Sequence, residues 1–348
     1  MKEVKPPEKS YFNYLYISLL ILRFIATLFP GYIHPDEFFQ GGQELFFGCS
    51  GSFNVKNTLL ENGPYRSLGV EFWNLITPWE FQPEHALRSI FPPTLMTLFP
   101  LRIYTLMKAF VIDFDKVSPL TNLSGLEILV VPRLFLAFLS LTVDTSIQYI
   151  STIKINRQAK NNVIYDLVLS PTPEVLIFAG SWPVIIFLGR PFSNSLETIF
   201  LSLLLTSFVY NRQQANQLGK YTSNIGGLLV IGVVCSMGVF TRFTFAFFAF
   251  PVVITILHHR GVQGIMVRDT GLRKYSVRVL SSFIWIFVSF SVTSFVIMKV
   301  DRCFYHSQYN DPSPSSIIDY VENLTPLNAL TYNSKARNLA DHGTFYVE

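Results

Sequence analysis

Half of the 348 residues are hydrophobic and only 14% are charged, whereas soluble domains carry about 25% charged residues. This balance favours a membrane protein over a soluble enzyme or binding module. The net charge of +4 is modest and the basic residues lie in short loops between apolar runs, so no nucleic acid is expected as a partner. The cysteines have neither the spacing of a zinc site nor that of a disulfide framework.

The chain contains a series of apolar runs that are candidates for membrane-spanning helices. A bilayer core about 30 Å thick needs roughly 17 to 25 apolar residues in helical conformation. In chain order the candidate spans are Tyr11–Phe29, Leu126–Ile150, Glu174–Gly189, Leu196–Tyr210, Ile225–Phe240, Phe243–His258 and Val277–Met298. The first follows a polar segment without a cleavage site, so we expect it to serve as an uncleaved signal anchor. These runs predict an all-α polytopic membrane protein.

The distribution of lysine and arginine predicts which side of the membrane each loop occupies. Basic residues gather before the first span, after the second, after the fourth and before the last. If the seven spans alternate, these segments share one side, which the positive-inside rule assigns to the cytosol. A further apolar stretch, Thr94–Ile112, is interrupted by Pro100, Arg102 and Lys108. It must then lie on the surface, re-enter the membrane or cross it twice.

The same alternation divides the chain into three regions. Residues 1–10 would be cytosolic and residues 11–298 would form the transmembrane bundle. The predicted lumenal segments are the loop 30–93, the turns 190–195 and 241–243, and the tail 299–348. Two N-glycosylation sequons, at Asn122 and Asn323, also fall on the lumenal side. This agreement supports the orientation.

The long loop after the first span begins with the string His34-Pro35-Asp36-Glu37. A proline at the first helical position followed by two acids is typical of a helix start, because carboxylates are favourable at the positive helix end. Two adjacent carboxylates beside a membrane, flanked by aromatics, are also suited to take a proton from a hydroxyl nucleophile. Desolvation there would raise a carboxyl pKa above its usual value of about 4. Spacing alone favours the helix start.

The second half of this loop combines an aromatic, an acid and an arginine in Trp79, Glu80 and Arg88. Trp79 is typical of an anchor at the membrane interface, and Glu80 and Arg88 are consistent with solvated or mutually paired charges. In the functional alternative, Arg88 binds a lipid phosphate and Glu80 orients sugar hydroxyls.

Charged residues also lie within the apolar runs, at Arg23, Arg133, Asp144 and Arg242. Such charges are costly in a membrane and usually face a cavity or one another. Arg133 and Asp144 are about three helical turns apart, so they are not expected to touch within one straight helix. A structural polar network is the alternative to a functional site.

The junction before the fourth span carries Arg190 and then the string Ser193-Asn194-Ser195-Leu196-Glu197. An arginine and several hydrogen-bonding side chains would thus lie at a lumenal helix end. Ser193 or Asn194 could equally cap the following helix. No Walker loop, dinucleotide motif or zincin helix is present, and the single Asp113-Phe114-Asp115 is too isolated to be assigned a metal.

Together these strings resemble glycosyltransferase family 22, the eukaryotic membrane mannosyltransferases that use dolichyl-phosphate mannose. The resemblance is carried by Tyr32-Ile33-His34-Pro35-Asp36-Glu37 with Phe39-Gln40, by Trp79-Glu80-Phe81, by Leu87-Arg88-Ser89, and by Arg190 with Phe192-Ser193-Asn194-Ser195-Leu196-Glu197, and it runs from about Tyr11 to Gly343. It implies a GT-C-like helical bundle with a long lumenal loop after the first span, held in the endoplasmic-reticulum membrane and in contact with its lipids.

The resemblance also implies a chemistry. Mannose would be transferred with inversion from dolichyl-phosphate mannose, with Asp36 as general base and Glu37 as the second candidate. The substrate- and phosphate-binding candidates are His34, Glu80, Arg88, Arg190, Asn194 and Arg242. Because the lipid phosphate is itself the leaving group, neither a nucleotide cofactor nor a metal is expected.

Within the family, the tail resembles the members that add the fourth, α1,2-linked mannose to the glycosylphosphatidylinositol (GPI) precursor glycolipid. The strings are Leu324-Thr325-Pro326-Leu327-Asn328, Tyr332-Asn333 and Asn338-Leu339-Ala340-Asp341-His342-Gly343. Such enzymes continue through further spans, so we expect residues 299–348 to begin a longer C-terminal region. The alternatives are a member acting on another GPI or N-glycan acceptor, an inactive fragment, or a transporter. A transporter is disfavoured because the chain shows no repeated halves.

Overall fold

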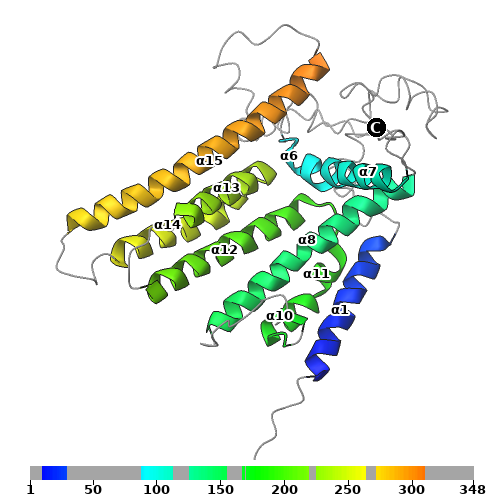
Figure 1. Ribbon diagram of the computed structural model, residues 1–348, viewed down its shortest axis with the longest axis horizontal. Helices are drawn as coiled ribbons and strands as arrows, with labels where there is room; N and C mark the ends of the chain where they lie inside the picture. Colours follow the sequence, from blue (N-terminus) through cyan, green and yellow to red (C-terminus); the bar gives the residue numbers. More distant parts are fainter. Residues whose placement is uncertain are drawn as a thin grey trace, which may run out of the picture.

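The computed structural model describes residues 10–29, 88–112, 125–154, 167–168, 170–218, 225–263 and 272–309. All regular elements in these ranges are helices (Figure 1). They are α1 (Ser10–Leu28), α6 (Phe91–Pro93), the π-helical turn η3 (Thr94–Leu98), α7 (Phe99–Ile112), α8 (Gly125–Lys154), α10 (Pro173–Ala179), α11 (Trp182–Phe187), α12 (Ser193–Leu218), α13 (Ile225–Thr241), α14 (Phe245–Gln263) and α15 (Leu272–Tyr309). The predicted all-α class is confirmed for this part of the chain.

Four of these helices are long and apolar enough to cross a membrane. The qualifying segments are Tyr11–Leu28 of α1, Leu126–Ile153 of α8, Phe245–Val262 of α14 and Tyr275–Arg302 of α15, and α13 is a shorter apolar helix. The polytopic membrane architecture expected from the sequence is therefore confirmed. Several helices run beyond the spans predicted for them, and the extension is longest in α12, which reaches Leu218, and in α15, which continues to Tyr309, into the segment predicted as tail.

The predicted span Glu174–Gly189 is not one helix but two short ones, α10 and α11. The break lies at Gly180 and Ser181, and Ser181 adopts an extended backbone before the second helix. Pro183 explains it, since proline has no N–H to donate and its ring clashes with the carbonyl four residues earlier. The interruption lets the chain approach α1 with both short helices.

The long helices lie side by side (Figure 1). Their directions alternate along the chain when the short helices α10 and α11 are counted together as the return between α8 and α12, which run in the same direction. Helix α13 packs against α12, α14 and α15, while α8 lies between α12 on one side and α1 on the other. Tight turns join α11 to α12 and α13 to α14. As a result, the C-terminal end of α1, the start of α8, both tight turns and the end of α15 share one end of the bundle.

The interrupted stretch Thr94–Ile112 is helical and lies across this end of the bundle (Figure 1). Helix α7 packs on α8, where Glu127 accepts hydrogen bonds from Tyr104 Oη at 2.6 Å and Lys108 Nζ at 2.9 Å. These bonds to the carboxylate raise the pKa of both Tyr104 and Lys108. How this helix lies relative to the membrane stays a prediction.

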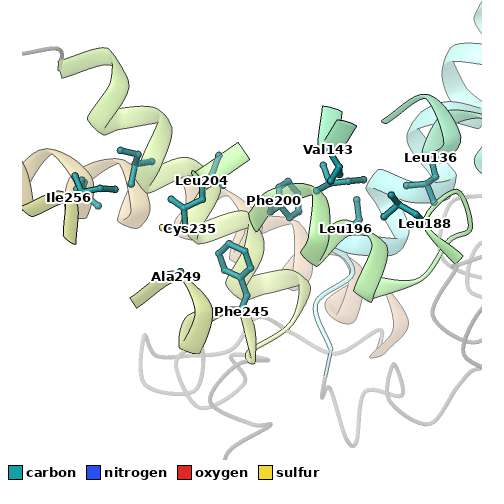
Figure 2. Close-up of a cluster of buried hydrophobic side chains, with 14 of the residues drawn as sticks. Leu136, Val143, Leu188, Leu196, Phe200, Leu204, Cys235, Phe245, Ala249 and Ile256 are labelled. Carbon is teal, nitrogen blue, oxygen red and sulfur yellow. The ribbon is translucent and has the colours of Figure 1, made fainter. Parts of the chain in front are cut away.

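The apolar core lies between α8, α11, α12, α13, α14 and α15 (Figure 2). Small residues bring α13 against α15, where Gly232 faces the Ser289 hydroxyl and Ser236 is hydrogen-bonded to Ser294 at 3.0 Å. Apolar surface gives little driving force for association within a bilayer, so close packing and interhelical hydrogen bonds hold such helices together.

A fully buried ion pair joins α1 to α8. Arg23 donates to the two Asp144 oxygens at 3.0 and 3.2 Å and to Ser140 Oγ at 3.2 Å. The Tyr16 hydroxyl donates to the same carboxylate at 2.9 Å. The expectation that charges within the apolar runs face one another is thus confirmed for Arg23 and Asp144. Arg133 lies elsewhere, as its distance along α8 predicted.

Candidate functional site

The end of the bundle described above also gathers the predicted site residues that the structure describes. These are Arg88, Arg190, Asn194 and Arg242. The other candidates, His34, Asp36, Glu37, Glu80, Asn122 and Asn323, lie outside the described residues. The helix ends around Arg88, Arg190, Asn194 and Arg242 therefore form the described part of the site.

Two buried arginines close the C-terminal end of α1. Arg190 Nη2 donates to the carbonyls of Ala26 at 3.0 Å and Phe29 at 3.3 Å, and Arg133 Nη1 also donates to the Phe29 carbonyl. The last carbonyls of a helix have no partner within it and carry the negative end of its dipole, so cations are favourable there. Both side chains are fully buried. Arg190 therefore holds the end of α1.

Gly189 permits this close approach. A Cβ atom at Gly189 would lie 2.2 Å from Thr27 Oγ1 of α1, a distance that real side chains do not adopt. The chain then turns at once, as the N–H of Phe192 donates to the carbonyl of Arg190 at 2.7 Å. Helix α12 begins directly after this turn, at Ser193. The turn thus delivers Ser193, Asn194 and Glu197 to the same end of the bundle.

The turn between α13 and α14 brings Arg242 to these side chains. Arg242 Nε lies 3.4 Å from Glu197 Oε2, and Nη1 donates to Ser193 Oγ at 3.5 Å and to Asn194 Oδ1. Thr244 Oγ1 donates to Glu197 Oε1 at 2.9 Å. Two segments that are almost fifty residues apart in sequence therefore form one polar cluster.

An apolar contact fixes the position of this turn. The ring of Phe245, which is fully buried, lies where a side chain at Gly238 would be, since a Cβ there would meet it at 2.3 Å. Figure 2 shows Phe245 in the core beside Ala249 and Cys235. The Arg242 N–H donates to the Gly238 carbonyl at 2.9 Å. Arg242 is thus placed by the core beneath it as well as by its polar partners.

The cluster is suited to bind an anion. Arg242 is 32% exposed, and its Nη2 group makes no hydrogen bond to the part of the chain that the structure describes. The positive N-terminal ends of α12 and α14 lie beside it. A guanidinium with one free amino group at such a position matches the geometry and charge of a phosphate oxygen.

The segment before α6 is attached to the same end by α15. The Asp301 carboxylate accepts hydrogen bonds from Ser89 Oγ at 2.9 Å and from the backbone N–H of Ile90 at 2.8 Å. Because Asp301 is only 7% exposed, it holds these donors away from solvent. Arg88 immediately precedes them and is half-buried. No group of three His, Cys, Asp or Glu side chains that could hold a metal occurs within the described ranges.

A sequence profile of the Alg9-like mannosyltransferase family matches residues 70–345, well over half of the chain. The chain belongs to this family. The match includes the Arg88 segment and both turns that build the polar cluster, so the cluster lies within the part of the chain that carries the family's pattern. This agrees with the family resemblance inferred from the motifs.

Three similar proteins show how the chain relates to longer family members. It is 26% identical to the GPI mannosyltransferase 4 of Candida albicans over 96% of this chain and 55% of the relative. It is 27% identical to the human GPI alpha-1,2-mannosyltransferase 4 over 95% of this chain and 48% of the relative, and 28% identical to the Aspergillus oryzae GPI mannosyltransferase 4 over 94% and 49%. The chain thus spans about half the length of these relatives. No solved structure matches it.

Three members of this site were not predicted from the sequence. They are Thr244, Asp301 and Glu197, the last of which is the partner of Arg242. A signal existed for Glu197, because residues three apart share one face of a helix and Asn194 was already a candidate. For Asp301 no local signal exists, since its partners precede it by more than two hundred residues.

Proposed function

We propose that this chain transfers mannose, with inversion, from dolichyl-phosphate mannose to a lipid-linked glycan. The acceptor we propose is the third mannose of the GPI precursor, which would receive a fourth mannose in α1,2 linkage. The observation that carries the proposal is the polar cluster around Arg242 at the helix ends of a mannosyltransferase-family chain. Relatives bearing the GPI mannosyltransferase 4 name align over nearly all of this chain and support the choice of acceptor.

We place the protein in the endoplasmic-reticulum membrane, with this end of the bundle in the lumen. The alternating helices and the basic segments at the other ends of the spans support that orientation. The phosphate of a polyprenyl phosphate lies at headgroup depth, which is where a helix-end arginine can reach it. The proposed donor can thus meet Arg242 without leaving the membrane.

In the proposed reaction, Asp36 is the general base and Glu37 the second candidate. The acceptor hydroxyl attacks the anomeric carbon of mannose on the face opposite the phosphate, and its proton passes to the carboxylate. The bond between that carbon and the phosphate oxygen breaks, and its electron pair stays on the oxygen. One displacement of this kind inverts the anomeric centre, as it does in glycoside hydrolysis by inversion.

Arg242 is the proposed phosphate ligand. The donor is a phosphodiester with one negative charge, whereas the departing dolichyl phosphate gains a second as the bond breaks. A fixed cation stabilises this developing charge more than it stabilises the donor, and so lowers the barrier. Arg88 is the further phosphate candidate, and His34, Glu80 and Asn194 are proposed to contact sugar hydroxyls or the acceptor. No nucleotide or metal is required by this scheme.

The first prediction tests both the acceptor and the base. Cells that lack the protein should accumulate trimannosyl GPI precursor and lose the tetramannosyl form, as measured by mass spectrometry of extracted lipids. Re-expression of the wild-type chain should restore the product, and the Asp36→Asn variant should restore it far less, because an amide cannot take the proton. A normal tetramannosyl pool in the deleted cells would rule out the acceptor. Full restoration by Asp36→Asn would rule out the base.

A further inference from the structure

The guanidinium of Arg242 is held through two of its three nitrogens. Its Nε faces Glu197, and its Nη1 is bound to Ser193 and Asn194. The remaining Nη2 group has no hydrogen-bond partner among the residues that the structure describes. Three side chains of α12 therefore orient the guanidinium while leaving one amino group exposed to a ligand.

Glu197 is itself held in place by a second group. Its Oε2 faces Arg242 at 3.4 Å while its Oε1 accepts a hydrogen bond from Thr244 at 2.9 Å. The carboxylate is only 14% exposed, so it is more constrained than an ordinary surface acid. Because Thr244 and Arg242 belong to the same turn, Glu197 connects both ends of that turn to α12.

We propose that Glu197 is a positioning residue that fixes the direction of the Arg242 guanidinium for phosphate departure. This inference rests on the proposed function, and it adds to it a residue that would touch neither sugar nor phosphate. An arginine side chain has several rotatable bonds, and a carboxylate bound to Nε removes the rotation that would turn Nη2 away. Correct orientation matters because a displacement of about 1 Å can reduce a rate by about a hundredfold.

The charge of Glu197 distinguishes positioning from simple attraction. A negative carboxylate beside Arg242 opposes the binding of any anion, so its removal strengthens the field that a phosphate meets. If only that field mattered, Glu197→Gln would bind the donor more tightly and react at least as fast. If orientation matters, the same variant binds the donor as well as the wild type, or better, and turns over more slowly. The two effects therefore separate in kcat, which falls only if orientation matters.

The test compares four variants of the full chain in proteoliposomes with dolichyl-phosphate mannose and a trimannosyl GPI acceptor. Glu197→Gln is nearly isosteric. Thr244→Val removes the hydroxyl that donates to Glu197, and Thr244 is itself exposed, so the change leaves the core intact. The matched controls are Glu174→Gln, the same change on an exposed acid in the first turn of α10, and Thr198→Val, whose hydroxyl donates to the Asn194 carbonyl. Thermal unfolding of each variant in detergent shows that it folds.

We expect Glu197→Gln to lower kcat by about tenfold to a hundredfold with KM for the donor unchanged or reduced. Thr244→Val should also lower kcat, but by a smaller factor, and the two controls should keep the wild-type kcat and KM. If Glu197→Gln and Thr244→Val keep the wild-type kcat, or raise only KM, the inference fails and the proposed function stands. If the wild-type chain transfers no mannose from this donor, the proposed function fails and the inference fails with it.

Discussion

Two arginine–carboxylate pairs in this molecule differ in how far the arginine is exposed. Inside the bundle, both Nη groups of Arg23 donate to Asp144, and both side chains are fully buried. At the helix ends, Arg242 meets Glu197 through Nε, is one-third exposed and keeps one amino group available. The first pair holds two helices together, whereas the second can still bind a further anion.

The different surroundings explain this division. A charge within the membrane is tolerated only when a counter-charge and hydrogen bonds satisfy it, so a buried pair has little capacity left for a ligand. At the membrane boundary water lowers that cost, and an incompletely satisfied guanidinium can persist. Exposure of the arginine, rather than the presence of a pair, therefore separates the structural pair from the cluster that we propose to bind phosphate.

The largest effect is expected from Asp144→Asn, which leaves Arg23 buried without its counter-charge. Loss of one partner of such a pair costs about 3–5 kcal/mol of stability. Thermal unfolding of the purified protein in detergent should show this loss. The double variant Arg23→Met with Asp144→Met should lose less than Asp144→Asn, because apolar groups replace both charges. If Asp144→Asn is as stable as the wild type, the Arg23–Asp144 pair does not hold α1 and α8 together.

Arg242→Ala should have the opposite profile, with little change in stability and a large change in transfer. Removal of one group that stabilises transition-state charge costs about a hundredfold to a thousandfold in kcat. Arg242→Lys should also be slow, because an ammonium group cannot bind Glu197 and a phosphate through separate edges. Initial rates with dolichyl-phosphate mannose measure both. The control is Arg102→Ala, an exposed arginine of α7, and an equal loss in that control would contradict a specific role.

A smaller effect is expected from Gly189→Ala, which tests the contact between the Arg190 turn and α1. The added Cβ would lie 2.2 Å from Thr27 Oγ1, so the turn or α1 must move. Such overpacking costs about 1–3 kcal/mol, measurable by thermal unfolding. Adding Thr27→Ala should recover part of the loss by making room. Gly180→Ala should lose less stability, because its Cβ would lie 3.1 Å from its nearest neighbour. Equal losses of stability in Gly180→Ala and Gly189→Ala would show that the contact with Thr27 is not specific.

Arg190 illustrates what a local pattern does not show. Its position beside helix-capping residues at a predicted lumenal junction suggested a phosphate ligand, and this stays a prediction. The structure shows that Arg190 donates to the carbonyls of Ala26 and Phe29. Those carbonyls precede it by more than 160 residues, so nothing near Arg190 in the chain indicates that they need a donor.

The amino-acid sequence by itself determined the helical membrane architecture, the family and the types of side chain at the helix ends. Apolar run lengths and short motifs carry that information locally, because a helix satisfies its own backbone and a motif preserves its own chemistry. Only the tertiary structure decided that Arg23 meets Asp144, that Arg190 closes α1 and that Glu197 meets Arg242. These pairings depend on which helix faces meet after packing, and such contacts join residues dozens to hundreds of positions apart.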